Sequence, residues 1–396
     1  MRIQRLLKRV TAITISAALL TGVAACGSTE QVSDNNNEDT VEQAQVADSD
    51  KDVVGNSDDA VVDEPKNEIA FDAEENTIRF AIQAGTIRTA VEILADGLGY
   101  YEEEGVNVEL VDSNDATATL TSISSGKKDI DVYGQGIVPD LTFIANGSDL
   151  VIFEGTAAEG GAVVSRPEDV EKFKDLANYE GVTAALVRNE SGWIVTRQAL
   201  LDAGYDPTTI TLLEVDSQAN AAQAVSKGEA DIAFFPEEFV ASFSDLNIAE
   251  VFPVGEISPM YVCCRQVTSS DRLETKRDAF IKFTKANLRA FKYFSDEANR
   301  EEIDRILAEF SGQTEEYVDN YFFVNSTTLT LDPNKSGVET YYQALINSGY
   351  FEESTDVSVS DHINTEIYKT ALDEIIEEYP DDPFYQEQLE IFNQYN

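Results

Sequence analysis

Two stretches of the chain decide its fold: LTSISSGKKDIDVYG at residues 120–134 and AQAVSKGEADIAFFP at residues 222–236. Each has a helix end, then a glycine (Gly126 or Gly228), two residues, Asp-Ile (129–130 or 231–232) and an apolar run. A glycine in the left-handed conformation ends a helix, and the chain then turns directly into a buried strand. The repetition predicts two similar α/β lobes with a cleft between them, although Gly-x-x-Asp-Ile also fits two unrelated helix–strand turns.

The residues before the first stretch continue the same alternation. Thr77–Ile82 is apolar enough for a buried strand, and the apolar spacing from Ala90 to Leu98 is that of a helix that ends at Gly99. A second strand is expected over Val106–Val111. Strands that alternate with helices predict an α/β fold with mostly parallel sheets.

The N-terminal residues have the pattern of an export signal. Four basic residues between Arg2 and Arg9 precede an uncharged apolar run, residues 10–25, that is short for a membrane-spanning helix. Val23-Ala24-Ala25-Cys26 resembles a bacterial lipobox, which implies that residues 1–25 are removed and that Cys26 is lipidated. The alternative is an ordinary secretory signal followed by a chance cysteine. Residues 26–75 are acidic and polar, and we expect a disordered tether there.

Composition excludes several classes of function. The chain has 28 basic and 74 acidic residues and a formal net charge of −46, which argues against binding to nucleic acid or to anionic lipid. Its cysteines are Cys26, Cys263 and Cys264, so it has no framework of disulfides. About 320 residues follow the tether, which is enough for two lobes with cores of their own.

Five segments together resemble one family. They read IRFAIQAG (78–85), LADGLGYYEEEGVNVELV (94–111), LTSISSGKKDIDVYG (120–134), FKDLANYEGVTAALV (173–187) and AVSKGEADIAFFPEE (224–238). The chain resembles the extracellular solute-binding proteins of ABC transporters, and within them the nitrate, sulfonate, taurine and thiamine-precursor group (SsuA/THI5-like). The piece GYYEEEGVNV is the most distinctive. The resemblance covers about residues 76–300, and the lysine that the family has after Gly181 is missing here.

The resemblance implies a type II periplasmic-binding-protein fold. The first lobe would hold residues 76–165 and 262–396, and the second would hold residues 166–261. Function would be capture of a small solute, either a sulfonate- or nitrate-type anion or a thiamine-precursor-like heterocycle. The lobes would close on it and deliver it to an ABC permease. We expect a lipid-anchored monomer on the extracytoplasmic face of a bacterial membrane, with no cofactor, no metal and no nucleic acid.

The family places ligand contacts on the loops that follow the strands. The candidate ligand-binding residues here are Gly85, Thr86, Arg88, Tyr133, Gln135, Gly155, Thr156, Asn189, Ser191, Gly192, Trp193, Asp216, Glu237 and Arg265. Several have a simpler interpretation, because Tyr133 and Trp193 are residue types that commonly pack in a core, and acids such as Glu237 favour a solvated helix start. Arg88 would suit an anion, whereas Trp193 would suit a flat ring.

The sequence also bears on two other classes of function. An enzyme is disfavoured because His362 is the only histidine, so a Ser-His-Asp site in the cleft would need a histidine that the chain does not supply there. The second class is a lipid-anchored sensor or adhesin that has the same two lobes and binds a protein partner, and the sequence is compatible with it. For Cys263 and Cys264 we expect small buried packing rather than a metal site, with the two thiols on opposite faces of a strand.

Overall fold

A computed structural model describes residues 73–83, 85–188, 190–324, 328–350 and 357–396. The predicted signal peptide, the lipidation site Cys26 and almost all of the predicted tether lie outside the described residues. No helix in the described part of the chain is both long enough and apolar enough to span a membrane.

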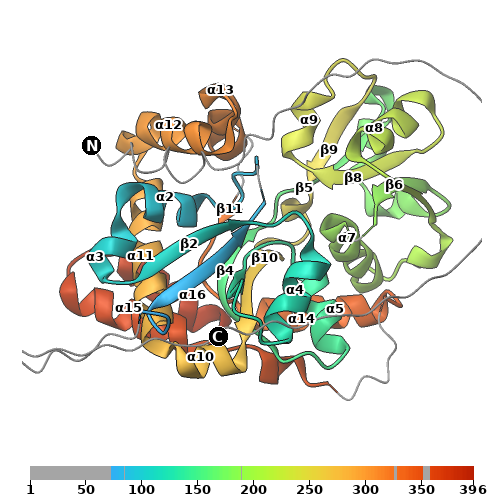
Figure 1. The fold of residues 1–396 in the computed structure, drawn as a ribbon. Helices are drawn as coiled ribbons and strands as arrows, with labels where there is room; N and C mark the ends of the chain where they lie inside the picture. Colours follow the sequence, from blue (N-terminus) through green and yellow to red (C-terminus); the bar gives the residue numbers. More distant parts are fainter. Residues whose placement is uncertain (1–72, 84, 189, 325–327, 351–356) are drawn as a thin grey trace, which may run out of the picture. The chain divides into compact units, whose positions relative to one another are not determined.

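The described residues form two mixed β-sheets (Figure 1). Sheet A has the order β11-β4-β10-β3-β1-β2, with bounds Thr328–Leu329, Leu150–Ala158, Val262–Ser269, Val132–Tyr133, Thr77–Ile82 and Asn107–Asp112. Sheet B has the order β7-β6-β8-β5-β9, with bounds Thr211–Val215, Thr183–Val187, Ile232–Pro236, Gly161–Ser165 and Ala249–Pro253. In each sheet three neighbouring strands pair in parallel, β3-β1-β2 in sheet A and β7-β6-β8 in sheet B. Strands β10 and β5, by which the chain enters each sheet from the other, run antiparallel to these strands, and β4 and β9 pair antiparallel with β10 and β5.

The chain passes between the sheets twice. It leaves β4 at Ala158 and enters β5 at Gly161, and it returns from β9 to β10 through residues 254–261. Strand β5, which the predicted boundary at residue 165 assigns to the first lobe, pairs with β8 and β9 of sheet B. Strand β10, which begins at Val262, lies in sheet A. The division into two lobes at residues 165 and 262 stays a prediction.

Helices surround both sheets. They are α2 (Ala90–Leu98), α3 (Tyr100–Glu104), α4 (Ala116–Ser124), α5 (Ile137–Ala145), α6 (Val170–Phe173), α7 (Ser191–Asp202), α8 (Gln218–Lys227), α9 (Glu238–Ser242), α10 (Ser270–Thr275), α11 (Arg277–Ser295), α12 (Arg300–Ser311), α13 (Glu315–Asp319), α14 (Lys335–Asn347), α15 (Glu366–Glu378) and α16 (Pro383–Tyr395). Helix α11 is the longest of these and packs against α2, α3 and α15.

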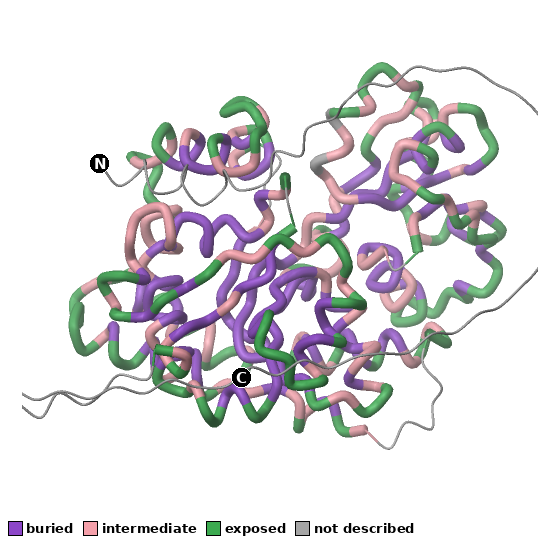
Figure 2. Tube along the Cα trace, viewed as in Figure 1, coloured by how far each residue is buried: buried purple, intermediate pink, exposed green. Residues whose placement is uncertain are grey.

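The core of sheet A is built on aromatic rings. Phe283 of α11 lies 5.9 Å from Phe80 of β1, and Phe280 lies 5.0 Å from Phe153 of β4, with distances measured between ring centroids. All four side chains are fully buried, and Figure 2 shows buried segments at the centre of this sheet. Burial of side chains of this size contributes about 1.5–3 kcal/mol each.

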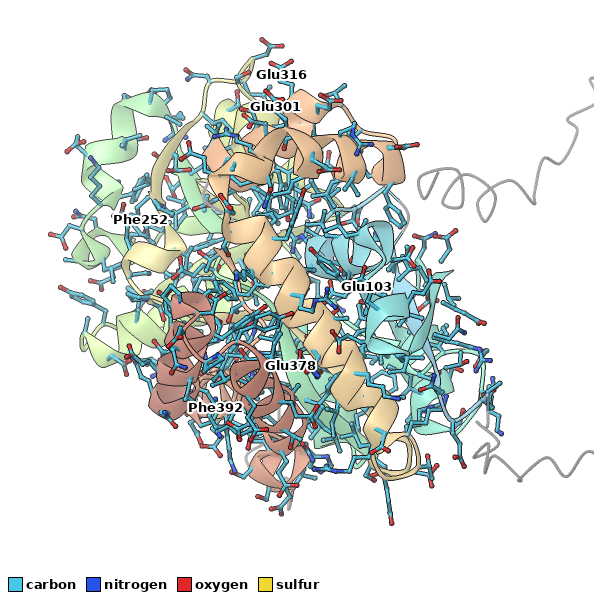
Figure 3. The ribbon with its side chains drawn as sticks, turned by 90° about the vertical axis from the view of Figure 1, so that its left-hand side faces the viewer. Glu103, Phe252, Glu301, Glu316, Glu378 and Phe392 are labelled. Carbon is cyan, nitrogen blue, oxygen red and sulfur yellow. The ribbon has the colours of Figure 1, made fainter. Side chains whose placement is uncertain are left out.

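The acidic charge lies largely on the outside. Glu301 of α12 and Glu316 of α13 are exposed, and Figure 3 shows both on an outer edge of the ribbon. Glu103 and Glu378, which the same view labels, are exposed as well. Solvated carboxylates at such positions are compatible with folding despite the high net charge, because water screens them from one another.

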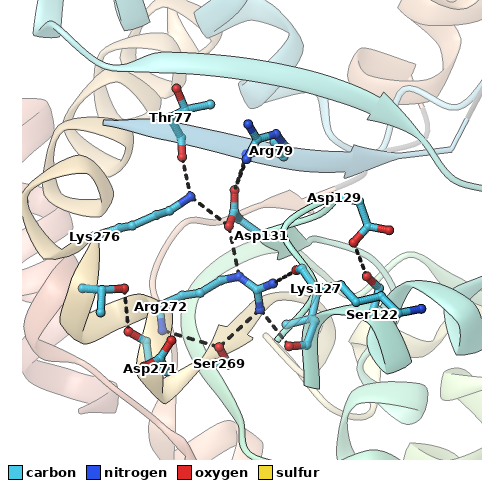
Figure 4. Close-up of polar contacts among 12 residues, drawn as sticks. Thr77, Arg79, Ser122, Lys127, Asp129, Asp131, Ser269, Asp271, Arg272 and Lys276 are labelled. Carbon is cyan, nitrogen blue, oxygen red and sulfur yellow. Dashed lines mark hydrogen bonds and ion pairs between the residues drawn. The ribbon is translucent and has the colours of Figure 1, made fainter. Parts of the chain in front are cut away.

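The repeated stretch that predicted two similar units is present, but in a different register. In sheet B the carboxylate of Asp231 accepts from the Thr183 N–H at 2.9 Å, while the Asp231 N–H donates to the Thr183 carbonyl. In sheet A the residue with the same two bonds is Asp131, which pairs with Arg79 at 2.9 and 2.8 Å. Asp129, which the sequence pattern aligned with Asp231, instead accepts from the Ser122 hydroxyl (Figure 4).

Asp131 has further partners, to which Asp231 has no counterpart among the residues that the structure describes. Its other carboxylate oxygen lies 3.0 Å from Arg272 Nε and 3.0 Å from Lys276 Nζ (Figure 4). The Arg272 and Asp131 side chains are almost completely buried, so this is an ion cluster inside sheet A. It ties strand β1, the loop before β3 and helix α10 together at the end of the sheet away from the strand C-termini.

Candidate functional site

A cavity of about 520 Å³ lies where the strand ends of the two sheets face each other, and we call it the inter-sheet cavity. Loops after β1, β3, β6 and β8 contribute to it, because ligands of open α/β sheets bind beyond the carboxyl ends of the strands. It is lined by Gln83, Gly85, Thr86, Arg88, Gln135, Gly136, Ile137, Val138, Pro139 and Cys263 around sheet A, by Val187, Arg188, Glu190, Ser191, Gln218, Pro236 and Phe239 around sheet B, and by Gly160 and Tyr317.

Gln135 is the most informative residue of the lining. Its side chain is 8% exposed, and its amide Nε2 finds no hydrogen-bond partner among the residues that the structure describes. The residue itself is held in place, since its backbone carbonyl accepts from the Arg265 N–H at 3.1 Å. Buried amide groups are nearly always paired, so an unpaired donor at a cavity wall indicates a place where a ligand acceptor would bind.

Two arginines line the cavity in different settings. Arg88 follows β1, and its backbone N–H donates to the Thr86 hydroxyl at 3.3 Å, which fixes the turn. Arg188 follows β6; its side chain is 75% exposed and forms an ion pair with Glu214 at 2.9 Å. Arg88 is half-buried, so its charge is less screened by water than the charge of Arg188.

The first turn of α7 carries its own carboxylate. Glu190 Oε1 accepts from the Gly192 N–H at 3.2 Å and caps the helix. A helix N-terminus is a favourable place for an anion, and here the protein supplies one. Ser191, which also lines the cavity, adds a hydroxyl that can donate to a ligand or accept from it.

The structure brings together five of the predicted site residues. Gly85, Thr86, Arg88, Gln135 and Ser191 line the inter-sheet cavity. Asn189 lies outside the described residues. Glu237 is half-buried and Asp216 is exposed, and neither lines the cavity. The other predicted residues are buried and are not part of the lining: Tyr133, Gly155, Thr156, Gly192, Trp193 and Arg265.

Buried contacts explain why these residues lie away from the cavity. Arg265 is fully buried and donates to the carbonyls of Pro333, Ala157 and Cys264 at 3.1, 3.1 and 2.7 Å. Trp193 is 4% exposed and packs on Phe234, with 5.4 Å between ring centroids.

Gly155 has a different reason. A Cβ there would lie 2.4 Å from the Thr330 carbonyl, so the glycine allows residues 330–332 to pack on β4. Gly155 is therefore needed for packing, because the atoms that approach it closely belong to the chain itself and not to a ligand.

Several lining residues escaped sequence reasoning. Arg188 and Glu190 flank the predicted Asn189 and follow a strand, and this position in the sequence could have indicated that they line the cavity. Tyr317 comes from α13, far along the chain from the other lining residues, and nothing in its local sequence indicates the cavity. Cys263 also lines the cavity. His362 does not, and its Nδ1 lies 2.7 Å from the Leu150 carbonyl. Within the described residues, no group of three or more His, Cys, Asp or Glu side chains could hold a metal ion.

Comparison with known proteins gives one family and one curated relative. The family model described as "NMT1/THI5 like" matches residues 87–300. The chain is 27% identical over 224 residues to the Bacillus subtilis (strain 168) protein named "Putative binding protein YtlA". That match covers 55% of this chain and 66% of the relative, so the chain spans slightly less than two thirds of the relative's length.

Solved structures share the fold at low identity. The periplasmic nitrate-binding protein NrtA from Synechocystis PCC 6803 is 16% identical with a TM-score of 0.58, over 76% of this chain and 89% of that one. The periplasmic aliphatic sulphonate binding protein SsuA from Escherichia coli is 16% identical with a TM-score of 0.57, over 71% and 90%. These likenesses confirm the predicted α/β periplasmic-binding-protein fold with two lobes.

One further structure bears on the question of catalysis. The desulfurization enzyme DSZB is 12% identical with a TM-score of 0.52, over 76% of this chain and 99% of that one. The fold alone therefore does not separate binding proteins from enzymes, and only the residues of the site can do so.

Proposed function

Because the chain belongs to the NMT1/THI5-like family, whose model matches residues 87–300, we propose that it is a substrate-binding protein of an ABC transporter. It captures a small solute in the inter-sheet cavity, closes its two lobes on it and delivers it to a membrane permease. A lipid on Cys26 holds it at the extracytoplasmic face of the membrane, where the acidic tether keeps it near the permease.

The unpaired amide of Gln135 is the observation that carries this proposal. The cavity is lined from both sheets, so a solute inside it contacts both lobes at once. A ligand that contacts both sides favours the closed state by its extra affinity for that state. Without a solute, the Gln135 donor stays desolvated and unpaired, which costs about 1–3 kcal/mol.

Of the two solute classes expected from the sequence, the lining favours an anion with several acceptor oxygens. Arg88, Gln135, Thr86 and Ser191 can all donate hydrogen bonds. Trp193, which would have suited a flat ring, is buried against Phe234, the simpler of its two interpretations. The cavity therefore matches a sulfonate- or nitrate-type solute better than a pyrimidine.

Binding is a better account of this cavity than catalysis. The sole histidine, His362, lies elsewhere and contacts a backbone carbonyl. The lining supplies hydrogen-bond donors, one carboxylate that caps a helix, and a thiol. A lipid-anchored sensor or adhesin that uses the same lobes on a protein partner is the alternative, and it would need a different surface from the one described.

The test is a thermal-shift screen of the full-length chain carrying Cys26→Ser, so that no lipid is attached. The panel holds alkanesulfonates, taurine, nitrate and pyrimidines. A ligand that binds only the folded state raises the melting temperature, by a free energy of about 2.7 kcal/mol at one hundred times its dissociation constant. A concentration-dependent rise with an anion supports the proposal, and no response to any member contradicts capture of these solutes.

Two arginine variants make the screen specific. Arg88→Gln should abolish the response to an anion, because a charge-assisted hydrogen bond contributes about 1.5–3 kcal/mol. Arg188→Gln is the matched control and should retain most of it, since Arg188 is exposed and already paired with Glu214. Equal losses in the two variants would mean that the anion does not bind on the Arg88 side of the cavity.

A further inference from the structure

Two adjacent thiols lie side by side at the inter-sheet cavity, and Cys263 is the one that lines it. Neighbouring residues of a regular strand point to opposite faces, which was the expectation for Cys263 and Cys264. The pairing of β10 with β4 shifts register on both sides of Cys264, between Val262 and Cys264 and between Cys264 and Arg265. This irregularity turns the two side chains together, and their Sγ atoms are 3.4 Å apart.

The two thiols have different surroundings. Cys263 lines the inter-sheet cavity, whereas Cys264 is 1% exposed and forms a backbone bridge with Gly136. The pKa of the Cys264 thiol is raised well above its ordinary value because it shares a hydrogen bond with Cys263 and because it is buried; the nearby Arg88 guanidinium opposes this shift. The two thiols share this hydrogen bond, in which either sulfur can be the donor.

We propose that Cys263 and Cys264 are a reversible dithiol–disulfide pair that reacts with low-molecular-weight disulfides entering the inter-sheet cavity. The Cys263 sulfur attacks one sulfur of the small disulfide, the S–S bond breaks, and one small thiol leaves with the Cys263 proton. The Cys264 sulfur then attacks Cys263, and the second small thiol leaves with the Cys264 proton. One small disulfide is reduced to two thiols and the protein dithiol is oxidised to one disulfide.

Geometry makes the product easy to reduce again. Consecutive Cα atoms are about 3.8 Å apart, whereas Cα atoms joined by a disulfide are usually about 4.4–6.8 Å apart. A disulfide between neighbours is therefore strained, and strained disulfides are the labile ones. The bond would also form next to Arg88 and the Gln135–Gly136 turn, so the oxidation state of the pair alters the wall that holds the solute.

The experiment uses the full-length folded chain and 2-hydroxyethyl disulfide, a small neutral oxidant. After an acid quench and alkylation, trypsin releases residues 228–265 as one peptide, since no Lys or Arg lies between Lys227 and Arg265. This peptide contains both thiols and excludes Cys26. We expect it to lose two hydrogens, to carry no adduct, and to regain both thiols on treatment with dithiothreitol.

Two single variants test the assigned order. Cys264→Ser should trap the small thiol as a stable adduct on Cys263, because the second thiol is gone. Cys263→Ser should leave Cys264 unmodified in the folded protein, because Cys264 does not face the cavity. The proposal is overturned if the wild-type peptide keeps an adduct on Cys263 or stays reduced while the urea-unfolded chain reacts. The wild-type measurement stands even where a variant does not fold.

Discussion

Replacement of Gln135 by methionine should make the solute-free protein more stable. Methionine has nearly the same length as glutamine but has no donor, so it removes the unpaired Nε2 without leaving a large hole. An unsatisfied buried donor costs about 1–3 kcal/mol, and part of this is relieved at a cavity wall, so we expect a gain of about 1 kcal/mol in the free energy of unfolding. In a chain of this size that raises the melting temperature by about 2 °C.

Gln266 provides the matched control. It is also a buried glutamine of sheet A, but its Nε2 donates to Glu92 Oε1 at 2.7 Å and to the Gly155 carbonyl at 3.1 Å. Gln266→Met removes both bonds and leaves their two acceptors buried, and it also removes the Gln266 Oε1, which has no partner among the described residues. Two acceptors lose their donor while one unpaired oxygen is removed, so we expect a net loss of about 1–3 kcal/mol. The same substitution at two buried glutamines should therefore change stability in opposite directions.

Urea unfolding followed by circular dichroism measures both effects without knowledge of the solute. The slope of free energy against urea should stay the same in the three proteins, so that shifts of midpoint report stability. The reasoning is refuted if Gln135→Met loses stability to the same extent as Gln266→Met, because the Gln135 amide would then be a structural partner. A gain in stability combined with a lost solute response would identify a residue kept for function.

Two further predictions concern buried charge. Asp131→Asn should lower the free energy of unfolding by about 3 kcal/mol, because Arg272 and Lys276 lose their shared carboxylate. The control Asp231→Asn affects a bond to a backbone N–H and should cost about 1 kcal/mol. Equal midpoints of urea unfolding in the two variants would contradict the ion-cluster account. Burial raises the pKa of Glu92 from an ordinary 4.5 to about 8, with Glu154 adding to the shift. Because the folded state then binds more protons than the unfolded state, the free energy of unfolding should fall as pH rises from about 4.5 to about 8, and Glu92→Gln should flatten that fall in urea titrations at several pH values.

The fold could be predicted because its local signals agree with each other. Gly228 has a φ of +72° at the end of α8, and β8 follows it after a short turn, as the repeated stretch predicts. The register was wrong by two residues in sheet A, where Asp131 and not Asp129 corresponds to Asp231. Two extra residues after Gly126 shift the pattern, and only the backbone pairing with the neighbouring strand shows which aspartate receives the N–H.

The site could be predicted only in part, because a position after a strand does not say which way a side chain points. Gln135 and Arg265 are both near strand ends and are joined by a backbone hydrogen bond, yet Gln135 faces the cavity and Arg265 faces the core. The inward orientation of the Arg265 side chain is set by the carbonyls that it binds, such as that of Pro333, which is 68 residues away in the sequence. Contacts of that range leave no local pattern in the sequence.

The two segments that join the sheets, residues 159–160 and 254–261, contact each other, and their residue types do not predict these contacts. Glu159 and Met260 have φ values of +59° and +58°, which cost about 1–3 kcal/mol each for residues other than glycine. The Glu159 carboxylate accepts from the Met260 N–H, and a Cβ on Gly255 would lie 2.3 Å from that carboxylate. The Tyr261 hydroxyl accepts from the Gly161 N–H at 2.9 Å.

Each strained residue on one crossing is thus held by a contact to the other crossing. If one lobe moved relative to the other by bending only one of the two segments, these contacts would break. The positive φ values of Glu159 and Met260 would then remain without the contacts that stabilise them. We expect the two segments to turn together as one unit, so that lobe closure is a rotation about this pair.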